Sequence, residues 1–346
     1  MIQAKIVADS LSPQGHRLTT LEVVMPRYIL AEFNTHRILS KNSASSRAIP
    51  FNKMVKNVQE NPFIPYAWQI DHKGMQGSNY FTDEEQISEH RLQWLEARNI
   101  AIQVAENMNH VGNVTKQLCN RLLEPFMYHK VLVSGTEWEN FFNLRCPQYE
   151  YIAEGETYTT KSWKSLEDML VKRKRDSLLE NAYEVNQTNT LFRLKHNKGQ
   201  ADIHMMFLAE AIYDAIQEST PRKLKEGEWH IPYGDNFDMG KIASISTKLD
   251  ISITEIVCKI SVARCARLSY QTLGDNPEIN YEKDLELYEV LSKSGHWSPF
   301  EHVARVMTEY EYNSYLHGRP LNGGIYSERG WCRNFKGFIQ QRALID

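Results

Sequence analysis

Residues 26–47 gather the side chains of this sequence that are best suited to bind an anionic ligand. They read PRYILAEFNTHRILSKNSASSR, so that His36 and Arg37 precede a run of hydroxyl and amide groups closed by Arg47. Guanidinium groups donate paired hydrogen bonds to phosphates and carboxylates. The alternative is a serine-rich surface turn after a helix. Such turns seldom hold so many directional groups, so we interpret the stretch as a candidate phosphate site.

Two arginines elsewhere could contact the same ligand. Residues 137–145 predict an amphipathic helix that ends in Arg145, although the helix dipole alone also favours a basic residue there. Its expected apolar face consists of Trp138, Phe141, Phe142 and Leu144. Arg121 lies in a second helix predicted over about 114–123, where an exposed arginine needs no functional reason.

Residues 295–302 form a third candidate segment, because GHWSPFEH places two histidines and a glutamate close together. A metal site is one interpretation. However, Pro299 interrupts the helix that a His-Glu-x-x-His site needs, and the spacing matches no zinc pattern. We therefore expect no metal.

Together these segments resemble the flavin-dependent thymidylate synthases. The family signature Gln-x-x-Arg-His-Arg, followed by Ser, Asn-Glu, Ser and Arg, matches residues 32–47 in spacing and departs from it at Glu32, Thr35 and Ser43. Residues 295–302 resemble the family's Gly-His-x-Ser/Thr-Pro-Phe-Glu-His. Weaker resemblances link 263–270 to Ala-Arg-x-Ser-Tyr, 137–145 to the segment beside the pyrimidine, and 121–125 to Arg-x-x-Leu-Pro.

The order of these segments differs from that of the family. Residues 255–310 match elements that the family carries near its N-terminus, whereas 17–145 and 201–217 match its C-terminal elements. The resemblance therefore implies a circularly permuted chain, in which 255–310 should pack against the helix predicted over 27–37.

The resemblance implies roles for particular residues. The implied catalytic residues are Glu32, Ser45 and Arg145. The implied substrate-binding residues are Glu32, Ser43, Ser45, Arg47, Arg121 and Arg145. The implied cofactor-binding residues are His36, Arg37, Ser40, Asn42, Asn140, Ser269, His296 and Ser298. The implied cofactors are FAD, methylenetetrahydrofolate as one-carbon donor and NADPH as a candidate reductant.

The function that this resemblance implies is transfer of a one-carbon unit to C5 of a pyrimidine deoxynucleotide, with dUMP converted to dTMP. Glu32 replaces an amide by a carboxylate, which only accepts hydrogen bonds when it is ionised. It would therefore suit the amino group of cytosine, so hydroxymethylation of dUMP or dCMP is an alternative. A non-catalytic nucleotide- or nucleic-acid-binding protein is a further one. The family's sites lie between subunits of a homotetramer, so we expect a homo-oligomer.

Composition narrows the class of protein. The chain has 346 residues, 42% of them hydrophobic, and a formal net charge of −3, which suits a soluble protein without an electrostatic surface for bulk nucleic acid. We see no signal peptide and no apolar run long enough for a membrane span. Five scattered cysteines indicate reduced, buried thiols in the cytoplasm.

The predicted fold is α/β: one interlocked domain over 1–346 with an antiparallel sheet flanked by helices. Residues 3–9 and 17–25 predict strands, and the helix over 27–37 should feed a polar loop over 40–47. Residues 52–80 should be irregular, and a long helix should begin near Thr82. Further helices are expected over 201–217, 239–248 and 252–268. Residues 146–200 should form a charged surface insertion.

Overall fold

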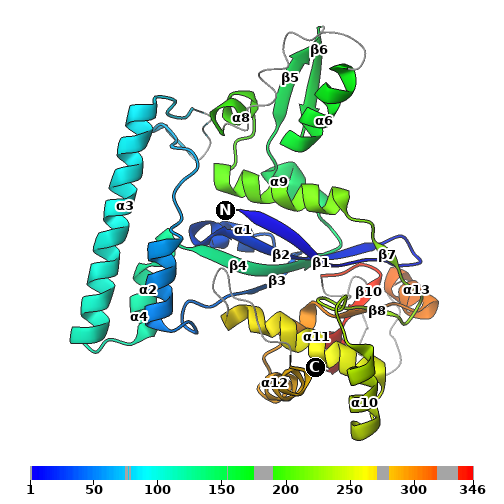
Figure 1. The fold of residues 1–346 in the computed structure, drawn as a ribbon. Coiled ribbons are helices and arrows are strands. Elements are labelled where there is room, and N and C mark those ends of the chain that lie inside the picture. Colours follow the sequence, from blue (N-terminus) through cyan, green and yellow to red (C-terminus); the bar gives the residue numbers. More distant parts are fainter. Residues whose placement is uncertain are drawn as a thin grey trace.

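A five-stranded sheet lies at the centre of the computed structural model, which describes residues 2–74, 77, 79–153, 155–174, 190–270, 280–317 and 334–345 (Figure 1). Its strands are β3 (Ser40–Ser43), β4 (Tyr128–Gly135), β2 (Arg17–Pro26), β1 (Gln3–Leu11) and β7 (Arg222–Lys223), in that spatial order. The first four pair antiparallel, and only the two-residue strand β7 runs parallel to its neighbour β1.

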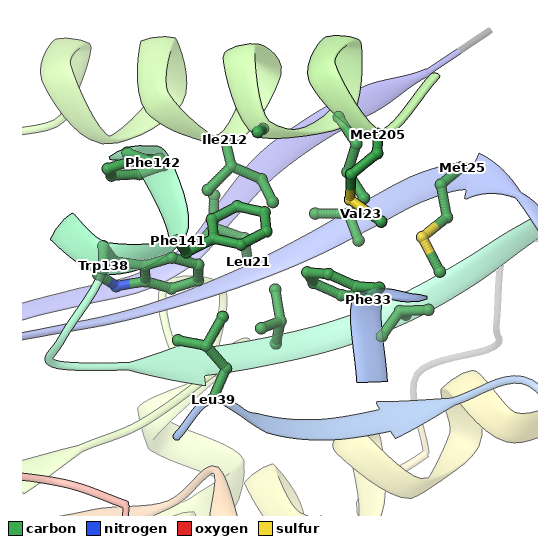
Figure 2. Close-up of a cluster of buried hydrophobic side chains, with 14 of the residues drawn as sticks. Leu21, Val23, Met25, Phe33, Leu39, Trp138, Phe141, Phe142, Met205 and Ile212 are labelled. Atoms are coloured by element: carbon green, nitrogen blue, oxygen red, sulfur yellow. The ribbon is translucent and has the colours of Figure 1, made fainter. Parts of the chain in front are cut away.

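One face of this sheet carries the largest apolar core. Side chains alternate along β2, so Leu21, Val23 and Met25 share one face. They pack with residues of α1 (Leu30–Asn34), α5 (Glu139–Arg145) and α9 (Ile203–Glu218). Figure 2 shows Phe33, Phe141 and Ile212 reaching into this cluster from those three helices. The core therefore fixes the ends of α1 and α5 relative to the sheet.

The opposite face of the sheet is covered by α11 (Ile253–Arg267). Val7 of β1 and Leu132 of β4 pack there against Cys265 and Leu268. Figure 1 shows α9 and α11 on opposite sides of the sheet, so the mixed α/β architecture with a largely antiparallel sheet between helices agrees with the prediction.

Three helices form a separate cluster beside the sheet. They are α2 (Phe51–Glu60), α3 (Glu84–Glu106) and α4 (Lys116–Leu122). Helix α3 begins two residues after the predicted start at Thr82, and the side chain of Asp83 caps it. Helix α2 was not predicted: its apolar residues Met54, Val55 and Val58 follow Pro50 directly, within a segment expected to be irregular.

Residues 149–174 and 190–196 project from the α9 side of the sheet (Figure 1). They form the hairpin of β5 (Tyr149–Ala153) and β6 (Glu156–Thr160), then α6 (Trp163–Lys174) and α8 (Thr190–His196). Helix α6 covers most of the charged stretch, whereas the hairpin was not predicted. Residues 175–189 of the expected insertion lie outside the described residues.

The C-terminal third surrounds α11. It contains α10 (Met239–Leu249), α12 (Tyr281–Lys293), α13 (Glu309–His317), α14 (Gln341–Ile345) and the small sheet of β8 (Trp229–His230), β9 (Ala304–Val306) and β10 (Phe338–Gln340). No helix in the described part of the chain is both long and apolar enough to cross a membrane.

The predictions for residues 27–47 were wrong in two respects. A 3-10 turn (Arg27–Ile29) precedes α1, and α1 ends at Asn34 instead of Arg37. The Thr35 hydroxyl donates to the Glu32 carbonyl at 2.7 Å at that end. Residues 40–43, predicted as loop, form β3 because they pair with residues 131–134 of β4. Pairing at a sheet edge thus overrides the turn preference of Ser and Asn.

Candidate functional site

Arg145 lies at the centre of a polar corner where the end of α5 meets the end of α1. Its Nε donates a hydrogen bond to His36 Nε2 at 3.0 Å, and its Nη1 pairs with the Glu32 carboxylate. These contacts leave Nη2 without a hydrogen bond among the described residues. Arg145 is therefore oriented by two acceptors and still offers donors to a ligand.

Aromatic packing holds the polar corner in place. The His36 ring meets the Phe141 ring edge-on at a centroid distance of 4.9 Å, and Phe33 packs against Phe141 at 5.7 Å. Phe33 and Phe141 both belong to the main core. Leu144, predicted to share that apolar face, is instead 57% exposed, because it points away from the core at the end of a short helix.

His36 is a neutral acceptor in this arrangement. Burial lowers its pKa to about 4, and the charges of Arg145 and Lys41 act in the same direction. Because Nε2 accepts a hydrogen bond from Arg145, the proton of the neutral ring belongs on Nδ1. His36 thus orients the guanidinium without adding a second positive charge.

Lys41 joins this corner to the segment 295–302. Its Nζ donates to the carbonyls of His36 and Leu39, the latter at 3.2 Å, and lies over the Phe33 ring. Its own carbonyl accepts a hydrogen bond from Ser298 Oγ at 3.2 Å. Burial lowers the Lys41 pKa to about 8. Lys41 was not predicted as a site residue, although it is the one cation between Arg37 and Arg47.

Further hydrogen bonds tie β3 and the chain after it to residues 265–269. Asn42 Nδ2 donates to the Cys265 carbonyl at 2.8 Å, and Asn42 Oδ1 accepts from Ser269 Oγ at 3.4 Å. The Ser45 amide donates to the Ser269 carbonyl at 3.0 Å. Segment 255–310 therefore contacts residues 41–45, which follow the helix that was expected to receive it. Whether this reflects a circular permutation stays a prediction.

Four residues expected to bind the cofactor are thus engaged within the protein. Asn42, Ser269 and Ser298 make the contacts just described, and Ser40 Oγ accepts hydrogen bonds from Asn334 and Gln340. Ser43 lies half-buried in β3. The four engaged side chains, those of Ser40, Asn42, Ser269 and Ser298, stabilise the junction between segments and are not free for a ligand.

Three other expected cofactor residues are exposed. Arg37, Asn140 and His296 make no side-chain hydrogen bond or ion pair among the described residues. Arg37 follows His36, Asn140 precedes Phe141, and His296 lies two residues before Ser298, so all three come from segments that meet at the polar corner. An anionic, aromatic group such as a flavin dinucleotide fits these free donors in type.

Arg47 and Arg121 belong to a different part of the molecule. Asn120 of α4 donates to the carbonyls of Ser46 and Ile49, at 2.6 and 3.0 Å, which places residues 46–49 against the helix that carries Arg121. Both arginines are exposed and have no ion pair among the described residues. No contact joins them to Arg145 within one chain.

A buried chain of hydroxyl groups and histidines, which was not predicted from the sequence, crosses the sheet from β1 to β4. His230 bonds Ser10 Oγ and Thr20 Oγ1, both at 2.8 Å, and Thr20 Oγ1 lies 2.6 Å from Ser134 Oγ. Ser134 Oγ in turn bonds His302 Nδ1 at 2.8 Å. Burial lowers the pKa of both histidines to about 3, so both are neutral at pH 7.

Four of the five cysteines lie in the described part of the chain. Cys119, Cys146, Cys258 and Cys265 are buried, as expected, and Cys332 lies outside the described residues. Within the described ranges no group of three or more metal-ligating side chains is found.

Comparison with known proteins finds no matching protein-family model and no matching curated protein. Among solved structures, the chain is similar to a UMP/dUMP methylase PolB from Streptomyces cacaoi bound with 5-Br dUMP: identity is 12%, the TM-score is 0.35, and 51% of this chain and 89% of that chain are covered. For the same methylase bound with 5-Br UMP, identity is 14%, the TM-score is 0.34, and 51% of this chain and 88% of that chain are covered.

Thymidylate Synthase X (ThyX) from Helicobacter pylori with FAD and dUMP is also similar, at 15% identity and a TM-score of 0.25, over 57% of this chain and 67% of that chain. TM-scores this low do not establish a common fold. The proposals below therefore rest on the side chains of this chain.

Proposed function

We propose that this protein binds a pyrimidine deoxynucleotide at the Arg145 corner and transfers a one-carbon unit to C5 of its base, converting dUMP to dTMP. The observation that carries the proposal is the orientation of Arg145 by Glu32 and His36, with Nη2 left free. A guanidinium fixed in this way is suited to a carbonyl oxygen on which negative charge develops.

A positive charge beside that oxygen favours the chemistry at C5. C5 of uracil is a weak nucleophile, and it attacks a one-carbon electrophile more readily when the base has enolate character, with negative charge on the neighbouring carbonyl oxygen. Arg145 would stabilise this negative charge through the carbonyl oxygen nearest C5, and the partly buried setting strengthens that interaction. Glu32 and His36 then act as positioning residues, since they hold the guanidinium and do not touch the reacting atoms.

The described cysteines favour a mechanism without a protein nucleophile. Burial raises the pKa of Cys258 to about 12 and raises the pKa values of Cys146 and Cys265 further. A thiol must ionise to attack carbon, so these three are poor nucleophiles at neutral pH.

The residues available to hold a flavin are Arg37, Asn140 and His296. A reduced flavin held there would supply the hydride that completes the methyl group, with methylenetetrahydrofolate as the one-carbon donor and NADPH as the reductant. Ser40, Asn42, Ser269 and Ser298 would support this site only indirectly, through the junction that they stabilise.

The ion pair between Glu32 and Arg145 removes the main reason to expect that the protein recognises cytosine. The carboxylate already has a charged donor in Arg145, so it does not need the amino group of cytosine. We therefore favour dUMP over dCMP as the substrate.

The separation of the arginines supports a site shared between subunits. Arg47 and Arg121 are free and exposed beside α4, whereas Arg145 lies at the α1–α5 corner. A neighbouring copy could bring its Arg47 and Arg121 to the phosphate of a nucleotide bound at Arg145. We propose a homotetramer with such shared sites.

Incubation with FAD, NADPH, methylenetetrahydrofolate and either dUMP or dCMP tests the proposal, with mass analysis of the nucleotide. We expect dUMP to gain a methyl group and Arg145→Ala to remove the product. The control Arg98→Ala on α3, whose side chain contacts Gln59 and Asn99, should retain it. A hydroxymethylated product would replace thymidylate synthesis by the alternative reaction. Unchanged nucleotides, with nucleotide binding retained, would favour a non-catalytic binding protein.

A further inference from the structure

A pocket whose lining does not include Arg145 lies beside α5. Its volume is about 590 Å³, within the range of small-molecule sites. Phe142, Asn143 and Cys146 line it from α5 and its end, and Lys161 and Ser165 line it from the segment after β6. The β5–β6 hairpin and α6 thus complete a pocket whose floor is α5 and α9.

Lys161 is the only charged residue among those that line the pocket. Its Nζ donates to Asn143 Oδ1, which holds the ammonium group at the wall formed by α5. The hydroxyls of Thr159, Ser165 and Tyr213 line the same space and make no hydrogen bond within the described part of the chain. One cation with several neutral donors is a set suited to an anion.

An aromatic wall adjoins these donors. The rings of Phe142 and Tyr213 meet edge-on at a centroid distance of 5.2 Å, and both line the pocket. An aromatic ring of a ligand could pack against them, since offset and edge-on ring contacts are favourable. The ligand would then carry a ring and an anionic group.

Charged side chains near the pocket limit how many negative charges the ligand can carry. Burial raises the pKa of the Cys146 thiol, Glu210 and Asp214 of α9 add to that rise, and Lys161 opposes it. Glu210 itself is paired with Arg193, outside this pocket. Lys161 therefore supplies the pocket with one positive charge, which balances a ligand with one negative charge better than a ligand with two. We propose that this pocket binds an aromatic monocarboxylate, with its carboxylate at Lys161 and its ring against Phe142 and Tyr213.

Calorimetric titration of the full chain with 4-aminobenzoate tests this site, and it does not depend on the proposed function. We expect saturable binding that Lys161→Gln weakens about tenfold or more. Asn143→Asp, which places a carboxylate beside the ammonium, should weaken it similarly. Lys164→Gln is the matched control, because Lys164 is exposed and paired with Glu218. Its binding should equal that of the unmodified chain.

Several results would overturn the inference. The charge would be irrelevant if the neutral 4-aminobenzamide bound as tightly, or if the two lysine variants lost affinity equally. Tighter binding of phenyl phosphate would replace the monocarboxylate by a dianion. Absence of saturable binding at millimolar concentration would remove the site. Titration of Lys161→Gln with dUMP tells the two proposals apart, since nucleotide binding at Arg145 should be unchanged.

Discussion

Arg145 shows how one side chain can be fixed and still remain available. Glu32 and His36 accept two of its hydrogen bonds, and the neutral state of His36 follows from burial beside two cations. From the sequence, the amino group of cytosine was one expected partner of Glu32. The structure contains the Arg145 pair, because α1 and α5 meet end to end on one core.

Replacement of Arg145 by Ala should weaken nucleotide binding by about 1.5–3 kcal/mol, the scale of hydrogen bonds to charged groups. The side chain ends at the polar corner, so the fold should persist. Calorimetry with dUMP measures the change, and Arg98→Ala serves as the control. Equal affinity of the Arg145 variant and the unmodified chain would remove Arg145 from the nucleotide site.

Glu32→Gln should lower kcat/KM for dUMP and for dCMP by similar factors. The amide holds the guanidinium less firmly than a carboxylate, so the loss comes from a misplaced Arg145 and not from altered base recognition. Steady-state kinetics on both nucleotides checks this. A shift of preference from dCMP to dUMP would instead show that Glu32 faces the base.

The neutral histidines predict a loss of stability in acid. The pKa of His230 is about 3 in the folded protein, below the ordinary value near 6.5, so the unfolded chain binds its proton more readily. Stability present at neutral pH should therefore fall as the pH drops below about 6.5. Each such histidine contributes about 1.4 kcal/mol per pH unit within that window.

Denaturant unfolding at pH 7, 6 and 5 measures this effect. His230→Gln should be less stable at pH 7, because it loses a bond to Ser10 or Thr20, and its stability should vary less with pH. An unchanged pH slope in this variant would mean that His230 does not remain neutral in the folded protein.

At the scale of elements, β3 is the main difference between expectation and structure. Ser40 and Ser43 have the local preference of a turn, and only pairing with β4, far along the chain, makes them a strand. Strand β2 and helix α9 were predictable, because their apolar residues repeat at the period of the element itself. The polar residues of the corner could be named from the sequence. Which of them bond within the protein, and which stay free for a ligand, depends on the tertiary structure.

Asn42→Ala should destabilise the protein by about 1–3 kcal/mol, since it leaves the buried Cys265 carbonyl without its donor. Chemical denaturation measures the free energy of unfolding. Asn52→Ala on the exposed face of α2 is the control and should change it little. Equal effects of the two substitutions would show that the junction between β3 and α11 adds no specific stability.

At the scale of the whole molecule, the two groups of arginines make a homo-oligomer testable by complementation. Arg121→Ala and Arg145→Ala chains should each lack activity alone. Mixing and reassociation should restore part of it, because some shared sites would then contain both arginines. Mixtures as inactive as the separate variants, despite confirmed exchange of subunits, would place the complete site within one chain.

Loss of the hydrogen from C5 of dUMP tests the central claim most directly, because any substitution at that carbon must displace it. With dUMP tritiated at C5, we predict tritium release into water that requires methylenetetrahydrofolate and reduced flavin, persists in Arg98→Ala and disappears in Arg145→Ala. Retention of tritium in the nucleotide under conditions where dUMP is bound would contradict the account.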